Sequence, residues 1–285
     1  MAAVPDNVLN STLGAAFIGA MIAAVLYGIT TLQTYFYFST YPNDRTDNKI
    51  LAGWVWILDT IQLAFVSHAL YHYTVTNYAN PVELLVMHWS LPVSTIFNII
   101  MAITVHFFFI LRIYHLAPRA IRVWLACFIG VLAVCRFCFG IETIVWELVR
   151  KEFSKLQSLL SMATLPFAIF AVSTDISVAV SLSVLLYRRR TGIPRTNIVL
   201  TTLIIHAVNR CVLTSVVSVA EIILFVTKPN TFWFVMTDFI AGKLYANSLL
   251  ATLNTRKALQ RSQHSELVNI RLPDTTLASS ADTKV

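Results

Sequence analysis

Seven runs of apolar residues, each long enough to cross a lipid bilayer, constrain the fold of this chain more than any other feature. A hydrocarbon core of about 30 Å needs about 20 residues of helix, and every run reaches that length. Backbone N–H and C=O groups find no water in lipid, so each run must form a helix. The sequence therefore predicts an all-α polytopic membrane protein, a seven-transmembrane-helix bundle. The spans lie near residues 12–38, 50–75, 89–115, 121–146, 159–187, 198–226 and 232–255.

The composition agrees with insertion in a membrane. Of the 285 residues, 57% are hydrophobic and 12% are charged, whereas a soluble domain carries about 25% charged residues. A net charge of +7 can indicate a nucleic-acid partner, but here the basic residues lie mostly between the apolar runs. We therefore expect membrane lipid, and no nucleic acid, as the partner of this chain.

The basic residues are divided unequally between the two sides of the predicted bundle. Lys and Arg are enriched in the cytoplasmic connections of membrane proteins. One side carries twelve, namely Arg45, Lys49, Arg112, Arg119, Arg122, Arg188, Arg189, Arg190, Arg195, Arg256, Lys257 and Arg261. The other side carries four, namely Arg150, Lys151, Lys155 and Lys228. This asymmetry predicts the N-terminus outside and the C-terminus cytoplasmic.

Three regions follow from this topology. Residues 1–11 are expected to be a short extracellular N-terminus, and residues 12–260 the seven-helix transmembrane domain. Residues 261–285 are polar and rich in Ser and Thr, which is typical of a disordered cytoplasmic tail. The protein is expected in a membrane as a multi-pass protein. The plasma membrane is only the default location, because span length does not identify an organelle.

The predicted spans contain eight ionisable side chains other than histidine. A charge at the centre of a bilayer costs several kcal/mol, so such residues face other helices, water or a ligand. Two interpretations remain open: a structural network in which acids and bases neutralise one another, which we favour slightly, or a polar pocket. The acids are Asp59, Glu142, Asp175, Glu221 and Asp238, and the bases are Arg136, Arg210 and Lys243.

Two of the runs place polar residues on one helical face. In the last run Asn247 follows Lys243 by four residues and Asn254 by eleven, which brings all three to one side. In the sixth run four polar residues stand at four-residue steps, namely His206, Arg210, Thr214 and Ser218. Glu221 follows three residues after Ser218. Asp175 is a plausible partner for Arg210. The predicted ligand-binding or structural network comprises Asp59, Arg136, Asp175, His206, Arg210, Lys243 and Asn247.

Histidines and cysteines give only weak indications of a metal site. His68 and His72 lie four residues apart, and Glu83 and His88 in the following connection are further possible ligands. Histidines at a membrane interface are more often amphipathic anchors, so we expect no metal and no cofactor. The pair Cys135-x-x-Cys138 has no second pair beside it, which favours ordinary helix packing.

The first run carries small residues at four-residue steps, namely Ala16, Ala20, Ala24 and Gly28. Small residues allow two membrane helices to approach closely. The stripe is expected to pack inside the monomer, and a homo-oligomer interface is the alternative.

Four stretches carry a resemblance to a known family. They are Leu26-Tyr-Gly-Ile with Gln33-Thr-Tyr-Phe-Tyr37, Trp56-Ile-Leu-Asp59-Thr, Arg190-Thr-Gly with Arg195-Thr, and Lys243-Leu-Tyr-Ala-Asn-Ser-Leu-Leu-Ala-Thr-Leu-Asn-Thr-Arg-Lys257. With these stretches the chain resembles a large family of basidiomycete fungal membrane proteins of unknown function, over about residues 10–260. The resemblance implies a multi-helix integral membrane protein. It carries over no catalytic or binding residue.

A seven-helix receptor or sensor is the favoured function, because the predicted topology and basic inner connections fit it. The third run, however, ends in Leu111-Arg-Ile-Tyr-His115 rather than an acidic-Arg-Tyr switch. The alternatives are a transporter or channel with a polar path along the sixth run, and a membrane metallohydrolase using the histidines. No phosphate-binding loop, G-x-S-x-G or H-E-x-x-H motif occurs, so an enzyme is not expected.

A retinal protein is a further, less favoured alternative. A lysine in the last span is the group that forms a Schiff base with a carbonyl ligand. The third run contains no carboxylate to act as counterion to Lys243. Asp238 precedes the lysine by five residues, which places it about 140° around the helix.

Overall fold

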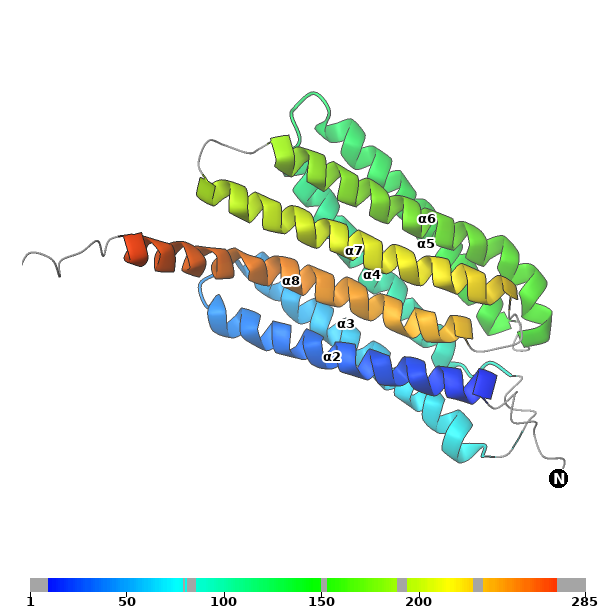
Figure 1. Cartoon of the computed structure of the whole chain (residues 1–285). Helices are drawn as coiled ribbons and strands as arrows, with labels where there is room; N and C mark the ends of the chain where they lie inside the picture. The colour runs from blue at the N-terminus through cyan, green and yellow to red at the C-terminus, as the bar shows by residue number, and fades with distance from the viewer. Residues whose placement is uncertain are drawn as a thin grey trace, which may run out of the picture.

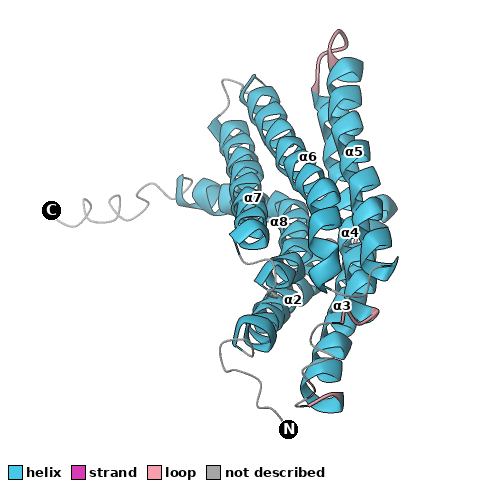
Figure 2. Cartoon of the chain, turned by 90° about the vertical axis from the view of Figure 1, so that its right-hand side faces the viewer, coloured by secondary structure: helices cyan, strands magenta, loops and turns pink. Residues whose placement is uncertain are grey.

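Seven α-helices make up almost all of the chain that a computed structural model describes, namely residues 10–78, 80, 86–149, 153–188, 194–227 and 233–270 (Figure 1). The helices are α2 (Ala15–Thr40), α3 (Thr46–Tyr71), α4 (Ser90–Leu116), α5 (Arg122–Val149), α6 (Phe153–Arg188), α7 (Pro194–Thr227) and α8 (Trp233–Ile270). Short π-helical turns precede α2 and follow α3, at η1 (Asn10–Gly14) and η2 (His72–Thr76). In the described part, Figure 2 shows helices and loops and no strand.

Six stretches in the described residues are helical, long and apolar enough to cross a membrane. They are Thr12–Thr40, Thr46–Thr76, Ser90–Leu116, Arg122–Val149, Ala163–Arg188 and Ala207–Leu224. The outside of the bundle is correspondingly apolar: Leu32, Val131 and Val216 expose 69%, 61% and 61% of their surface. Large exposed apolar surfaces mark contact with a membrane or a partner. These features are compatible with a multi-pass membrane protein.

The seventh predicted span, now α8, is not among these six stretches. Asp238, Lys243 and Asn247 lower its hydropathy. These side chains are buried or half-buried in the bundle. The helix lies between α7 and α2 (Figure 1) and contacts α2, α3, α4 and α7. Its polar groups therefore find protein partners rather than lipid.

Successive helices pack side by side in chain order, and α2 closes the ring against α8. We call the end of the bundle where α2 begins the N-end, and the end with the turn between α2 and α3 the turn end (Figure 1). Helices α2 and α8 run parallel, because Gly19 contacts Met236 near the N-end while Asn254 bonds Gln33 towards the turn end.

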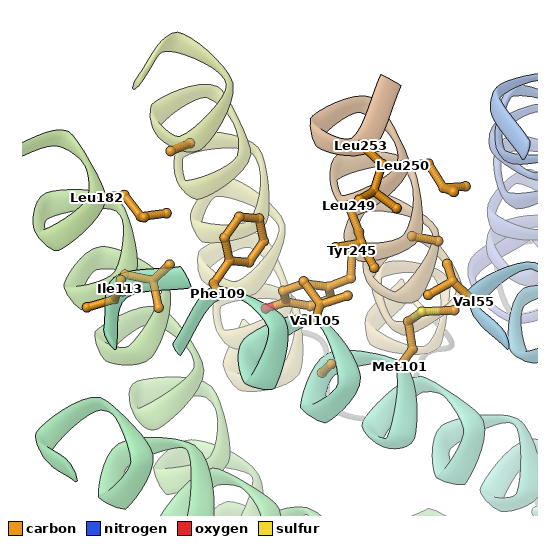
Figure 3. Packing of buried hydrophobic residues seen from close by; sticks show 14 of the residues in the cluster. Val55, Met101, Val105, Phe109, Ile113, Leu182, Tyr245, Leu249, Leu250 and Leu253 are labelled. Carbon is orange, nitrogen blue, oxygen red and sulfur yellow. The ribbon is translucent and has the colours of Figure 1, made fainter. Parts of the chain in front are cut away.

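Two apolar clusters fill the two halves of the bundle. The N-end cluster includes Ala23, Val66, Ala69, Val235 and Phe239. The turn-end cluster is larger, and Figure 3 shows its Tyr245, Leu249, Leu250 and Leu253 beside Met101, Val105 and Phe109. On α3, Asp59 and Gln62 lie between the residues of the two clusters, as Lys243 does on α8. The charged residues thus form a layer between two apolar halves.

The small-residue face of α2 differs from the predicted stripe. Ala16 and Ala20 are buried, but Ala24 and Gly28 are exposed. A four-residue step turns about 40° beyond a full helical turn, so repeated steps leave the face on which they start. The buried face instead combines Ala16, Ala20 and Ala23 with Gly19, which lies against Met236 of α8.

Several helices extend beyond their predicted ends, and the extension is longest in α8. Helix α8 continues past residue 255 to Ile270, because no glycine or proline interrupts the sequence between Gly242 and Pro273. Part of the region expected as tail is therefore helical, and residues 271–285 lie outside the described residues. The connection between the spans predicted at 121–146 and 159–187 is also partly helical, since α5 ends at Val149 and α6 begins at Phe153.

The contact between α2 and α8 predicts opposite effects for one substitution at two glycines. A Cβ on Gly19 would lie 2.6 Å from Met236 Cγ and 2.8 Å from Met236 Cα. A Cβ on Gly28 would have no other heavy atom of the protein within 4 Å beyond its own stretch of helix. Gly19→Ala should lower the free energy of unfolding in detergent by about 1–3 kcal/mol through overpacking. Gly28→Ala should leave it unchanged or raise it by up to about 1 kcal/mol through helix propensity. Equal effects at both sites would contradict this packing.

Candidate functional site

Lys243 of α8 and Asp59 of α3 form an ion pair at the centre of the bundle. Their side chains are both 0% exposed, and Lys243 Nζ lies 2.8 Å from Asp59 Oδ1. The ammonium also donates a hydrogen bond to the backbone oxygen of Asp59 at 2.7 Å. The contact with Oδ1 is an ion pair rather than an aligned hydrogen bond. Two opposite charges removed from water together attract each other strongly.

This pairing changes the expectation for a Schiff-base lysine. A carboxylate partner does exist, but it comes from the second predicted span rather than the third. Lys243 is nevertheless occupied by Asp59, and it lines none of the three cavities described below. In this conformation the lysine ammonium is therefore bound to Asp59.

Asn247 and Asn254 fasten α8 to α2. Asn247 Nδ2 donates to the Leu26 backbone oxygen at 3.0 Å, and Asn254 Nδ2 donates to the Gln33 oxygen at 2.9 Å. The two bonds are seven residues apart on both helices, which is two helical turns. Tyr41 adds a third bond in the opposite direction, from its hydroxyl to the Asn254 backbone oxygen at 2.7 Å.

Asp175 of α6 is the centre of a second buried cluster. Its Oδ1 accepts a hydrogen bond from Arg210 Nη2 at 2.6 Å, and its Oδ2 accepts one from the Tyr245 hydroxyl at 2.7 Å. Arg210 is the partner that the sequence predicts for Asp175. The guanidinium of Arg210 also lies over the Phe109 ring, 4.4 Å from its centroid. A cation over an aromatic face is stabilised by the ring quadrupole.

His106 of α4 completes this cluster. Its Nδ1 lies 2.7 Å from the Ala102 backbone oxygen, and its Nε2 lies 3.1 Å from Asp175 Oδ1. A carbonyl oxygen only accepts, so Nδ1 carries a hydrogen. Nε2 then faces a carboxyl oxygen, and a favourable contact there requires a proton between the two atoms. His106 thus contacts the Ala102 carbonyl with one ring nitrogen and the Asp175 carboxyl with the other.

Arg136 of α5 joins this cluster to the N-end half of the bundle. Its Nη1 donates to the Tyr245 hydroxyl at 2.9 Å, and Tyr245 donates in turn to Asp175. A narrow cavity of about 10 Å³ beside Arg136 is also lined by Glu221 and Asp238. The bonded chain of Arg136, Tyr245 and Asp175 thus extends from this cavity into the middle of the bundle.

Three carboxylates surround a second cavity towards the N-end, which we call the acidic cavity. Its volume is about 40 Å³, and helices α4 to α8 all contribute to its wall. The carboxylates are Glu147 of α5, Glu221 of α7 and Asp238 of α8. Asp238 accepts hydrogen bonds from Asn98 Nδ2 at 2.6 Å and from Thr95 Oγ1 at 3.2 Å. Glu147 Oε2 is buried without a hydrogen-bond partner.

A third cavity, the turn-end cavity, opens between α3, α4 and α8 and has a volume of about 560 Å³. Its wall includes Arg45, Asp47, Arg112, His115 and Thr252. The turn-end cluster of apolar side chains lies at the same end of the bundle and includes Phe109, Leu249 and Leu253 (Figure 3). The wall of the turn-end cavity is therefore partly polar and partly apolar, since Leu51, Phe108 and Leu253 also line it.

The structure divides the residues of the predicted network between separate clusters. Asp59 and Lys243 form one pair, whereas Asp175, Arg210 and Arg136 belong to the other cluster. Asn247 binds backbone rather than a charge, and the side chain of His206 lies outside the described residues. Glu142 is exposed on the surface of α5.

Sequence reasoning overlooked three members of the site. His106 and Tyr245 lie inside apolar runs and carry no formal charge at neutral pH, so a search for charged residues passes them by. Glu147 falls one residue beyond the span predicted at 121–146, although it lies on α5 with 8% exposure. Its position seven residues after Gly140, which is two turns along a buried face, is the signal that identifies it.

The histidines near the N-end stack on one another. The rings of His72 and His88 lie 3.8 Å apart between centroids with an interplanar angle of 26°, and His68 lies 5.4 Å from His88. Stacked rings direct their nitrogens along parallel planes rather than at one point. Burial, and to a smaller extent the neighbouring His72 and His68, together lower the pKa of His88 to about 4. Among the described residues no three potential ligands are grouped to hold a metal, and Glu83 is not described.

The Lys243–Asp59 pair predicts a strongly non-additive double-mutant cycle. Lys243→Met alone leaves a buried carboxylate unpaired and should lower the free energy of unfolding in detergent by about 3–5 kcal/mol. The double variant Asp59→Leu with Lys243→Met replaces both charges by apolar groups and should recover most of that loss. Thermal unfolding of the purified variants measures both values. The cycle is completed by Asp59→Leu alone. If the double variant loses the sum of the free energies lost by Lys243→Met and by Asp59→Leu, the two residues do not interact.

The comparison with known proteins finds one family. Residues 171–258 are similar to a family of unknown function, DUF6534. The match covers the second half of α6, all of α7 and α8 as far as residue 258, and so includes Asp175, Arg210, Lys243 and Asn247. No curated protein and no solved structure matches the chain. The similarity and the six apolar stretches support a membrane protein, without an activity.

Proposed function

We propose that this chain is a seven-span membrane receptor or sensor that receives its signal at the acidic cavity. In this proposal α8 is the seventh span, the N-end faces outward, and the turn end with the C-terminus faces the cytoplasm. The excess of Lys and Arg at the turn-end connections supports this orientation. A fungal source and the plasma membrane remain parts of the proposal that rest on resemblance and on default.

The observation that carries the proposal is the continuous polar connection from the acidic cavity to the centre of the bundle. Glu221 and Asp238 line both the acidic cavity and the narrow cavity beside Arg136. Arg136 binds Tyr245, and Tyr245 binds Asp175, which pairs with Arg210 of α7. A change of charge in the cavity therefore acts on residues that hold α5, α6, α7 and α8 together.

The apolar turn-end cluster favours a receptor over a channel or transporter. An ion or polar solute that passed along α7 would meet Phe109, Leu182 and Leu249 beyond the layer of charges. These side chains are each at most 2% exposed and pack against one another. An ion crossing a dry apolar region loses its hydration at a cost of many kcal/mol. The stacked histidines offer a metallohydrolase no convergent ligands.

Coupling between the two ends of the bundle tests the proposal. The parent protein has its free cysteines, Cys127, Cys135, Cys138 and Cys211, replaced by serine, and carries Thr252→Cys in the wall of the turn-end cavity. Glu147→Gln should change the rate at which an impermeant maleimide labels this cysteine by about fivefold or more, the lower end of typical coupling. The label should react only from the cytoplasmic side of sealed vesicles.

Two further variants show whether the coupling follows the proposed connection. Tyr245→Phe removes the hydroxyl that joins Arg136 to Asp175, and should abolish the response of the label to Glu147→Gln. Glu142→Gln changes an exposed carboxylate on the same helix and should have no effect. Equal labelling rates in all variants, or ion flux through vesicles that contain the protein, would contradict a receptor.

A further inference from the structure

The buried charges of the bundle do not balance at the acidic cavity. Asp59 is paired with Lys243, and Asp175 with Arg210. Glu147, Glu221 and Asp238 remain around one cavity, and Arg136 is the one arginine or lysine that lines the adjoining narrow cavity. Three carboxylates beside one guanidinium leave a deficit of positive charge in a region of low dielectric constant. Such a deficit is costly unless a cation or protons fill it.

Glu147 shows where the missing positive charge belongs. Its side chain lies in the wall of the acidic cavity, the residue is 8% exposed, and its Oε2 has no hydrogen-bond partner. Thr164 Oγ1 in the same wall is also buried without a partner. A buried carboxylate oxygen and a hydroxyl oxygen that both lack partners are expected to bind a ligand. Both are hard oxygen ligands, which suit a small cation.

We propose that the acidic cavity binds a small monovalent cation between Glu147, Thr164 and the carboxylates of Glu221 and Asp238. The cavity volume of about 40 Å³ is sufficient for one ion or one ammonium group with water. This inference rests on the proposed function in one respect, since it names the ligand class of the receptor site. The cation supplies one of the two missing positive charges, and a proton on one of the carboxyl groups supplies the other. Both lie at the end of the connection that continues through Arg136 and Tyr245.

The spacing of the acidic side chains argues for a monovalent rather than a divalent ion. Ca²⁺ is held by several oxygen ligands at about 2.3–2.6 Å, and Mg²⁺ requires near-octahedral geometry. Within the described residues no three acidic, histidine or cysteine side chains converge closely enough to share one metal ion. A hydrated Na⁺ ion, or an ammonium group that donates hydrogen bonds, tolerates the wider spacing because water bridges the remaining distances.

The test measures the thermal unfolding midpoint of the full-length protein in detergent at constant ionic strength. Sodium, potassium, ammonium or methylammonium chloride replaces tetramethylammonium chloride, whose cation is bulky and has no N–H donor. Bound cation stabilises the folded state, so the midpoint should rise with the concentration of at least one of the four salts. A rise in the midpoint with sodium alone indicates that the site binds a metal ion. A rise with both ammonium and methylammonium indicates that it binds an amine.

Variants connect this rise to the cavity. Glu147→Gln should weaken the apparent affinity by about tenfold or more, and Glu142→Gln, exposed on the same helix, should leave it unchanged. Thr164→Val, which removes only a hydroxyl, should weaken it less and serves if Glu147→Gln does not fold. No rise with any salt, or an equal rise in Glu147→Gln and the parent, would overturn the cation site.

The two proposals fail separately. If a cation binds but the Thr252→Cys label does not respond to Glu147→Gln, the site stands and the receptor function does not. If the label responds and no cation raises the midpoint, the coupling stands and the ligand class is wrong.

Discussion

The ion pair between Lys243 and Asp59 is the interaction on which the rest of the bundle depends. It joins α8 to α3 where both side chains are completely buried. An unpaired lysine at that depth costs several kcal/mol, so α8 can lie inside the bundle only while Asp59 faces it. Asn247 and Asn254 then connect the same helix to α2 through backbone oxygens. The least apolar helix thus becomes the one around which the others pack.

The remaining buried charges also need partners inside the protein. Those around Asp175 have them, and those around the acidic cavity have too few. Asp175 accepts bonds from Arg210 and Tyr245 and lies 3.1 Å from His106 Nε2, so its charge is paired within the cluster. The acids beside the acidic cavity exceed the bases near them, and Glu147 Oε2 has no partner. A cluster whose charges are paired favours one packing arrangement, whereas an unbalanced one responds to whatever neutralises it. We therefore propose a structural role for the first and ligand binding for the second.

Much of this interior follows from the sequence, because lipid forces charged side chains towards one another. The helical class, the six apolar stretches and the Asp175–Arg210 pair required only hydropathy and helical periodicity. The partner of Lys243 did not follow, since nothing in a sequence says which neighbouring helix turns its acid inward. Tyr245 and His106 were not predicted as members of the site, because the search was for charged side chains and these two are neutral. The buried face of α2 was predicted wrongly because the prediction kept a strict four-residue step. The buried face also contains Gly19 and Ala23, which lie off that step.

The central claim is that the bundle contains carboxylates paired with bases beside an acidic cavity whose Glu147 lacks a partner. Modification by a hydrophobic carbodiimide, mapped by mass spectrometry of the protein in lipid, tests this most directly. Glu147 should be modified faster than Asp59 and Asp175, which stay behind their partners, and the exposed Glu142 is the positive control. Modification of Asp59 as fast as that of Glu147 would show that the ion pair is open and would contradict the account.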